Sequence, residues 1–157
     1  MKSTRQKREV QCASLICPDC GAKLILQNKP AGWHGGGKFV YLCQNWPRCR
    51  GLLSAHPDGR PCGKPADAYT RNARKIVHEL FDPIWRNDKS KPRQKARIDA
   101  YSWLSAHCGI PQKECHISMM DLPQLRQVWR VIKQNSPTPE SIEEWVNASK
   151  GSRNDRS

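Results

Sequence analysis

The spacing of apolar residues divides the chain into two parts. Up to about residue 63 the apolar positions form short runs between glycines, and residues 23–27 and 38–43 have the composition of strands. The segment 30–37, which is rich in glycine, is the predicted loop between them. From Asp67 onwards, apolar residues recur three and four positions apart, and this spacing predicts helices.

The first helix is predicted to begin at Asp67, whose carboxylate is a suitable N-terminal cap. Asp82 and Pro83 are expected to end or kink it, because proline has no backbone N–H to donate. Ile84 and Trp85 nevertheless continue its apolar face. The residues predicted to form that face are Tyr69, Ala73, Ile76, Val77, Leu80 and Phe81.

Three further helices are predicted. One covers residues 93–108 and ends at Gly109, and another opens on a capping box of Asp121 and Gln124. A short acidic helix starts at Pro139 and ends near residue 148. The residues predicted to face inward on these helices are Ile98, Tyr101, Leu104 and Cys108, then Leu122, Leu125, Val128, Trp129 and Ile132, and finally Ile142, Trp145 and Val146.

Four cysteines have the spacing of a structural zinc site. Cys17 and Cys20 are two residues apart in the sequence CPDCG, where the backbone turns so that both thiolates reach one ion. Cys43 and Cys49 form the second pair. Four thiolates leave no open position on zinc, so the ion stabilises the fold of a segment that is too small and glycine-rich for a sizeable core.

The remaining cysteines leave alternatives open. Cys12 lies shortly before Cys17 and is a competing ligand, and Cys62 with His56 is compatible with a second metal site. The interpretation we favour for each is an ordinary packed side chain. Cys108 lies on an apolar helix face, where packing explains it.

These patterns predict an α+β protein, in which a small four-cysteine zinc ribbon of β-hairpins precedes three or four short helices. The expected divisions are a disordered basic tail (1–11), the ribbon (12–63), a helical domain (64–149) and a second disordered tail (150–157). The chain has no apolar run of about 18 residues, and its N-terminus lacks the apolar stretch of a secretory signal. We therefore expect a cytoplasmic location without membrane contact, where cysteines bind metal rather than form disulfides.

The formal charge of +13 is unevenly distributed. Residues 1–97 hold twenty Lys or Arg against seven Asp or Glu, whereas residues 98–157 hold seven of each. A positive field of this strength attracts polyanions, and nucleic acid is the commonest polyanion in a cell. The alternative is a basic surface that only contacts solvent.

Two groups of residues are candidates for contacts with nucleic acid. On the first helix, Arg71, Arg74 and Lys75 recur with His78 at helical spacing, opposite the predicted apolar face. In the ribbon, Trp46 precedes Arg48 and Arg50, which is the combination that stacks a base and holds its phosphates. The alternative for the helical stripe is a solvated surface.

The ribbon also resembles known zinc fingers. Residues 17–21 (CPDCG), 39–41 (FVY) and 43–50 (CQNWPRCR) are similar to the zinc ribbons at the C-terminal end of bacterial type I DNA topoisomerases. This resemblance implies contacts with single-stranded DNA through aromatic and basic residues. It does not imply topoisomerase activity, because the chain is too short for the catalytic domains.

A second resemblance covers most of the chain. Residues 61–63 (PCG), 78–85 (HELFDPIW), 100–104 (AYSWL) and 115–119 (CHISM) are similar to a family of phage and prophage proteins described as zinc-finger-containing, without an assigned function. Cys62 and Ser118 depart from the pattern of that family. The resemblance implies a phage or prophage origin in a bacterial host cytoplasm and supplies no mechanism.

The function predicted from the sequence is non-catalytic binding of nucleic acid, single-stranded or structured DNA rather than RNA, through a ribbon that holds one zinc ion. One alternative is an adaptor or inhibitor that binds a host protein through the neutral helical half, where Trp103, Trp129 and Trp145 form a core or a docking surface. The other is a small nuclease that uses His56 and His78, although no motif requires catalysis.

Overall fold

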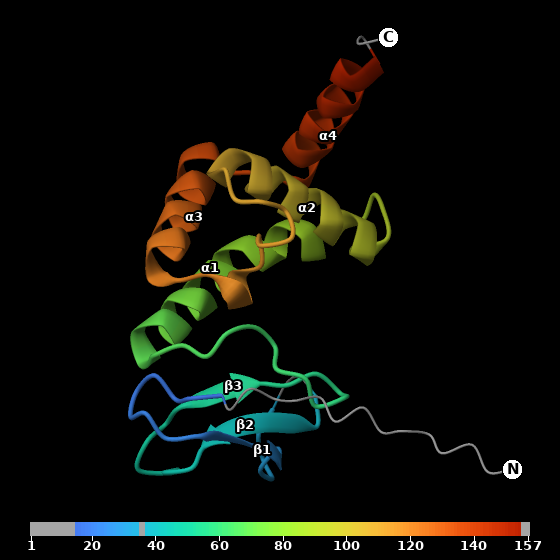
Figure 1. Ribbon diagram of the computed structural model, residues 1–157. Helices are drawn as coiled ribbons and strands as arrows, with labels where there is room; N and C mark the ends of the chain where they lie inside the picture. The colour runs from blue at the N-terminus through green and yellow to red at the C-terminus, as the bar shows by residue number, and fades with distance from the viewer. Residues whose placement is uncertain (1–14, 35–36, 155–157) are drawn as a thin grey trace, which may run out of the picture.

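The computed structural model describes residues 15–34 and 37–154, and its order of elements confirms the α+β class (Figure 1). Strands β1 (Leu24–Asn28), β2 (Phe39–Cys43) and β3 (Leu52–Ser54) form an antiparallel sheet in the order β1-β2-β3. The helices are α1 (Ala68–Arg86), α2 (Arg93–Cys108), α3 (Leu122–Asn135) and α4 (Pro139–Asn154), with the 3-10 helix η1 (Ile117–Met119) before α3. The basic tail predicted for residues 1–11, and Cys12, lie outside the described residues.

The sheet buries little apolar surface. Both predicted strands are confirmed to within a residue at each end, while β3 is an addition that the sequence pattern does not predict. In the register of the sheet, Leu24 pairs with Cys43, and Tyr41 pairs with Leu26 on one side and with Leu53 on the other. Ile25 and Leu26 of β1 remain more than two-fifths exposed. The sheet therefore depends on stabilisation other than its own small core.

Helix α1 begins as predicted and ends later than predicted. The Asp67 carboxylate accepts a hydrogen bond from the Thr70 N–H at 2.8 Å, which confirms the cap. Asp82 and Pro83 were expected to end or kink the helix, and the structure shows that it does not end there but continues through Pro83 to Arg86. Phe81 and Trp85 are buried on either side of the exposed Pro83, and their packing outweighs the missing backbone hydrogen bond.

Several positions that were predicted to face inward are exposed. On α1, Tyr69 is 83% exposed, because the first turn of the helix reaches past the helical core towards the sheet (Figure 1). Ile76 is 45% exposed and lines a groove between α1 and α3. On α2, Ile98 is 47% exposed, while its neighbour Asp99 is buried and paired with Lys95. The other buried residues of the inner face include Ala96, Ala100, Trp103 and Leu104.

The last two helices complete the core. Leu125, Val128 and Ile132 of α3 are buried as predicted, but Trp129 is 43% exposed. Ile142 and Val146 of α4 pack inward, and the helix runs on to Asn154. Residues 150–154, predicted as part of a disordered tail, are therefore helical. Residues 155–157 lie outside the described residues.

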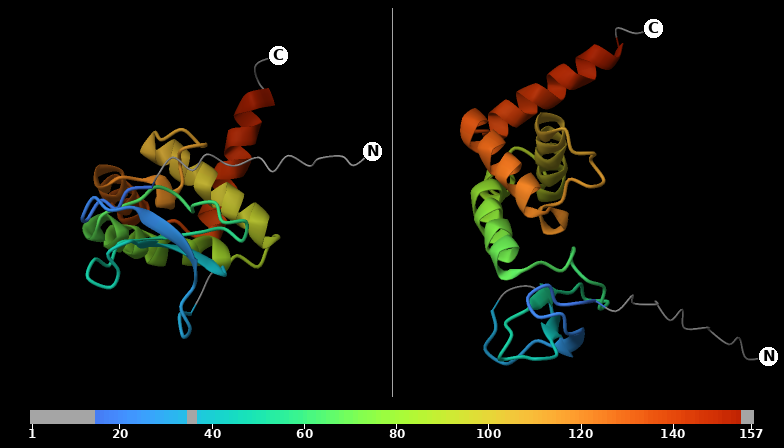
Figure 2. Two further views of the ribbon diagram at one scale, coloured as in Figure 1. Left: turned by 60° about the horizontal axis from the view of Figure 1, so that its bottom comes forward. Right: turned by 60° about the vertical axis from the view of Figure 1, so that its left-hand side comes forward.

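Two separate apolar clusters stabilise the molecule. One belongs to the sheet and includes Cys17, Leu24 and Tyr41, and the other joins the four helices around Phe81 and Leu104. Helix α1 lies between the sheet and the other helices, and α4 projects from the opposite end (Figure 2). No helix in the described part of the chain is long and apolar enough to cross a membrane.

Candidate metal centre and neighbouring basic surfaces

The four predicted zinc ligands meet at one point. The Sγ atoms of Cys17, Cys20, Cys43 and Cys49 all lie within 4.8 Å of one another, with Cys17 to Cys49 at 3.6 Å and Cys20 to Cys43 at 3.3 Å. Sulfur atoms in a tetrahedral zinc site, each about 2.3 Å from the ion, are about 3.8 Å apart. The arrangement therefore fits one structural Zn²⁺ with four thiolate ligands.

Local hydrogen bonds place each pair of ligands. The Gly21 N–H donates to the Cys17 carbonyl at 2.8 Å, and Gly21 has a positive φ of 75°, which closes the turn. The second pair spans the end of β2, where the Trp46 N–H donates to the Cys43 carbonyl at 2.9 Å and the Cys49 N–H to Asn45 at 3.1 Å. Two tight turns therefore bring four thiols to one side of the sheet.

Backbone N–H groups also point at the sulfur atoms. The Asn45 N–H lies 3.4 Å from the Cys43 Sγ. A hydrogen bond from the Ala22 backbone, followed by one from Cys43, lowers the pKa of the Cys20 thiol to about 7. Burial raises the pKa of Cys43 to about 12. Zinc binds cysteine as thiolate, so the N–H donors stabilise the charge that metal binding requires on the sulfur atoms.

Gly51 lies directly against the ligands. A Cβ atom at this position would lie 2.2 Å from the Cys17 Sγ and 3.3 Å from the Cys43 Cβ. Only glycine therefore allows the backbone after Cys49 to pass the metal centre. The sequence pattern did not identify this residue, because its requirement arises from contacts across the ribbon and not from a turn.

The zinc knuckle is joined to helix α1 through Asp19. Its carboxylate accepts a hydrogen bond from the Ala68 N–H at 2.9 Å and forms an ion pair with Arg71 at 2.8 Å. Arg71 also donates to the carbonyls of Ala66 and Arg50. A residue between two metal ligands thus caps the first turn of the helix, which couples the ribbon to the helical half.

Arg74 and Lys75, neighbours in the predicted basic stripe, have different environments. The Arg74 guanidinium donates twice to the Met120 carbonyl, at 3.1 and 2.9 Å, and once to the Lys64 carbonyl at 2.7 Å. Burial lowers its pKa. Lys75 is 73% exposed, and the only ion pair that it forms with a described residue is with Glu79, at 3.8 Å. A contact with nucleic acid stays a prediction for all three stripe residues, but Arg71 and Arg74 already have partners within the protein.

The predicted aromatic residue of the ribbon lies beside a second tryptophan. The rings of Trp33 and Trp46 meet edge to face, with centroids 5.6 Å apart. The Arg50 guanidinium lies 5.2 Å from the centroid of Trp46. A cavity of ≈ 550 Å³ lies next to Trp46 and Arg48. The sequence pattern did not identify Trp33, which comes from the loop before β2.

The second metal site that the sequence left open is not found among the described residues. There, the only group of three or more His, Cys, Asp or Glu side chains close enough to hold an ion is the four-cysteine set. Cys62 is partly buried, and this burial raises its pKa. His56 lies in the turn after β3, whereas His78 lies on α1, 3.3 Å from Asp82.

The fold and the site define a small zinc-finger protein with an appended helical half. The family model described as a zinc-finger-containing domain, DUF3268, matches residues 13–135, from just before the first ligand to the end of α3. This match covers most of the chain, and the protein belongs to that family. No curated protein and no solved structure gives a significant match. The phage origin and the relation to topoisomerase ribbons stay predictions.

Proposed function

We propose that the protein binds nucleic acid without catalysis, and that single-stranded or structured DNA is its ligand. The observation that carries the proposal is the surface formed by Trp33, Trp46, Arg48 and Arg50 beside the zinc centre, called here the ribbon surface. Trp33 is 38% exposed and Trp46 is partly exposed, so a base has access to both rings. Stacking on an aromatic ring stabilises single-stranded binding by about 1–3 kcal/mol per base.

The charge of the ribbon surface supports a phosphate backbone next to the stacked base. Arg48 and Arg50 are exposed, and neither forms an ion pair with a carboxylate in the part of the chain that the structure describes. The four-cysteine centre holds this loop in place, because Cys43 and Cys49 enclose it. A fixed loop loses little conformational entropy on binding, which favours affinity.

The non-catalytic part of the proposal follows from the partners of the histidines. The Asp82 carboxylate that faces His78 also forms an ion pair with Arg86 at 2.9 Å, and its pKa is lowered. His78 is therefore part of a paired cluster on the helix surface. The ribbon contributes His56, which has Asp58 nearby, while Asp58 pairs with Arg60. Neither arrangement leaves a carboxylate without a cation partner for acid–base chemistry.

The Trp46→Ala variant tests this proposal. We expect the zinc-loaded variant to bind a single-stranded oligonucleotide about 1–3 kcal/mol more weakly, and duplex DNA with a smaller loss, because duplex bases are already stacked. Affinity should fall with salt at a log–log slope of about −0.7 per phosphate contacted. Fluorescence anisotropy at several salt concentrations measures both quantities, and the oligonucleotide should be recovered intact with magnesium present.

Trp129→Ala is the matched control, because Trp129 is also accessible to a ligand but lies on α3, away from the ribbon surface. Its affinity for the oligonucleotide should equal that of the wild type. An unchanged affinity in Trp46→Ala, or an affinity that does not respond to salt, would remove the proposal.

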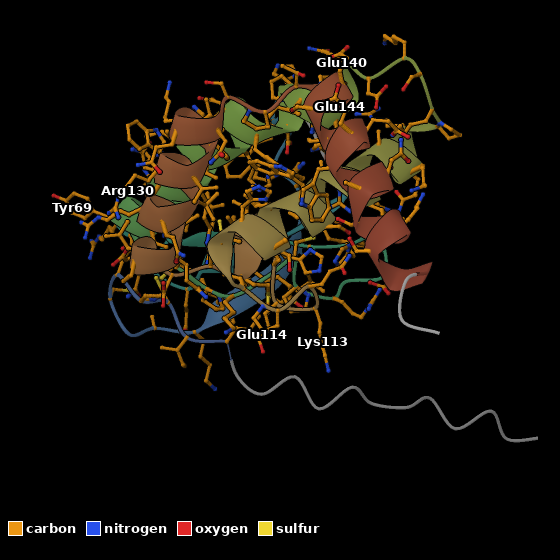
Figure 3. The ribbon with its side chains drawn as sticks, turned by 90° about the horizontal axis from the view of Figure 1, so that it is seen from above. Tyr69, Lys113, Glu114, Arg130, Glu140 and Glu144 are labelled. Atoms are coloured by element: carbon orange, nitrogen blue, oxygen red, sulfur yellow. The ribbon has the colours of Figure 1, made fainter. Side chains whose placement is uncertain are left out.

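A second candidate function rests on a groove between α1 and α3. This groove has a volume of ≈ 430 Å³ and an aliphatic lining that includes Ile76, Val77 and Leu125, with Trp129 at its edge. Arg126 and Arg130 also line it, and none of its lining residues is acidic. Arg130 and Tyr69 project from the same side of the molecule, away from Glu140 and Glu144 (Figure 3).

Aliphatic side chains with an arginine rim fit an amphipathic helix that carries acidic residues on its outer face. Bases fit this lining less well, because they stack on aromatic rings and not on aliphatic chains. The candidate partner is therefore an acidic, amphipathic helix of another protein, as an adaptor would bind. Charge complementarity with Arg126 and Arg130 would set its orientation.

A designed helical peptide tests the groove. Leucines at positions i, i+4 and i+7 with glutamate elsewhere should bind the wild type, and the same peptide with lysine in place of glutamate should not. Trp129→Ala should weaken binding of the acidic peptide by about ten-fold or more, since an aromatic anchor at an interface is worth about 2 kcal/mol. Calorimetry measures the affinities. Equal binding of both peptides, or an effect of Trp46→Ala as large as that of Trp129→Ala, would refute a specific groove.

A further inference from the structure

Three arginines converge on one buried tryptophan at the junction of α1 and α2. The guanidinium carbons of Arg86, Arg93 and Arg97 lie 5.2, 5.6 and 5.8 Å from the ring centroid of Trp85. Arg97 also lies 5.0 Å from the ring centroid of Tyr101. We call these three side chains the arginine cluster. Their shared contact with one ring places three positive charges on a small area of surface.

The cluster is only partly neutralised. Arg86 forms an ion pair with Asp82, whose other partner is His78. Arg93 and Arg97 form no ion pair with a carboxylate among the residues that the structure describes. The lysines nearby are different, since Lys91 and Lys95 both pair with Asp99 on the other side of α2. Counting Asp82 against the three arginines leaves a local excess of two positive charges.

The position of the cluster on α2 adds to this excess. The N-terminal end of a helix carries a partial positive charge, so acidic residues are favoured there and cations are disfavoured. Helices α1 and α3 begin with aspartate caps, as this rule predicts. Helix α2 begins after Pro92 with no side-chain cap and no acidic residue in its first turn, and Arg93 lies at its first position.

A purely structural role explains the cluster incompletely. Each arginine over Trp85 gains a favourable cation–π contact and covers the ring. Three guanidinium groups on one ring also repel one another, and a single arginine or an aliphatic side chain would cover the ring without that repulsion. A bound anion with a charge of about −2 would offset both the repulsion and the helix dipole.

We propose that the arginine cluster is a binding site for a phosphomonoester, the group at the end of a nucleic-acid strand or on a free nucleotide. A phosphomonoester carries about −1.5 to −2 charges and three acceptor oxygens at neutral pH, whereas an internal phosphodiester carries one charge. Guanidinium groups bind such oxygens in pairs of parallel hydrogen bonds. Because Trp85 is only 7% exposed, the site binds the phosphate and offers no ring for a base.

The arginine cluster alone supports a phosphate group as the ligand. That this phosphate belongs to a nucleic acid rests on the proposed function. The test uses the full-length, zinc-loaded protein and two single-stranded oligonucleotides of one sequence, which end in a 5′-phosphate or a 5′-hydroxyl. Adenosine monophosphate and inorganic phosphate are the free ligands. We expect the 5′-phosphate to improve affinity at least about ten-fold, as a single charge-assisted hydrogen bond would.

Arg97→Gln and Arg93→Gln should each reduce the ratio of the two affinities to near one. Lys113→Gln is the matched control, because Lys113 is an exposed cation in the turn after α2 and should leave the ratio unchanged. The ratio is insensitive to a general loss of positive charge, which would weaken both oligonucleotides alike. Thermal unfolding of each variant shows whether the helical core is intact.

The outcomes separate the two sources and the two proposals. If the 5′-phosphate improves the affinity of the oligonucleotide and this gain depends on Arg97, the ligand is a strand end. If the two oligonucleotides bind equally well but adenosine monophosphate binds in a way that depends on Arg97, the ligand is a free nucleotide. Failure of every phosphate probe, or preference for a phosphoserine peptide over all of them, overturns the inference. Binding of the 5′-hydroxyl oligonucleotide through Trp46 reports on the ribbon surface alone, so either proposal can fail while the other holds.

Discussion

The Cys43→Ser variant is expected to lose its zinc ion and to unfold the ribbon while the helices stay largely formed. Cys43 is fully enclosed in the sheet core, and it is one of four thiols within 4.8 Å of one another. Zinc binding supplies about 10–16 kcal/mol in zinc-finger peptides, far more than the small cluster around Leu24 and Tyr41 provides. The helices have their own apolar cluster around Phe81 and Leu104.

Metal analysis of the purified protein should find one zinc ion per chain in the wild type and none in Cys43→Ser. Amide hydrogen exchange should show loss of protection in strands β1 to β3 and in the first turn of α1, where Asp19 accepts the Ala68 N–H. Protection in α2 and α3 should persist. The first-turn effect is specific to this structure, because the connection between knuckle and helix is made through Asp19.

Two further variants control this result. Cys62→Ser removes a thiol from the same part of the chain that is not in the four-cysteine cluster, and it should keep the zinc ion. Gly51→Ala leaves all four thiols in place but introduces a Cβ at 2.2 Å from the Cys17 Sγ, so it should weaken zinc binding. Retention of zinc by Cys43→Ser, or its loss from Cys62→Ser, would contradict the ligand assignment.

The metal centre could be predicted from the sequence because its information is local. Two cysteines with two residues between them, followed by a glycine, predict a metal-binding turn whatever surrounds it. Strand β3 could not be predicted in the same way, since its three residues are too few for a period and are ordered by pairing with β2. The requirement for glycine at position 51 could not be predicted for a related reason, because the residues that Gly51 contacts lie in other turns of the ribbon.

The helical half shows where periodicity is insufficient. Apolar spacing located all four helices, but it placed Ile98 and Trp129 inward, where the structure exposes them. Spacing reports which residues share a face and does not report which neighbours are available to cover that face. In α2, the buried carboxylate of Asp99 pairs with Lys91 and Lys95, and no hydrophobic pattern contains that information.

The basic stripe on α1 gives the same lesson for function. Helical spacing correctly grouped Arg71, Arg74 and Lys75 near one another, but the sequence does not indicate which side chains remain available to a ligand. The long guanidinium side chains reach carbonyl groups far away in sequence, and the ammonium group of Lys75 stays in solvent. Arginine has five N–H donors in a fixed fork, which suits it to such bridging between segments.

Arg74→Ala is therefore expected to lower stability, and Lys75→Ala is not. Arg74 joins α1 to Met120, at the end of η1, and to Lys64, in the segment that leads out of the ribbon. Its removal leaves two carbonyls without their donor, one of them on the buried Met120. Hydrogen bonds that involve a charged group contribute about 1.5–3 kcal/mol, so a loss of about 2–3 kcal/mol is expected.

Lys75 is the neighbouring residue, has the same charge and is exposed, so Lys75→Ala should change the free energy of unfolding by less than about 0.5 kcal/mol. Urea denaturation measures the free energy of unfolding of both variants. Oligonucleotide binding is compared in the absence of urea, where each variant is folded. Under the structural role, folded Arg74→Ala binds DNA no more weakly than Lys75→Ala, because each loses one positive charge. A folded Arg74→Ala that is as stable as the wild type and yet binds DNA much more weakly would instead restore Arg74 as a direct phosphate contact.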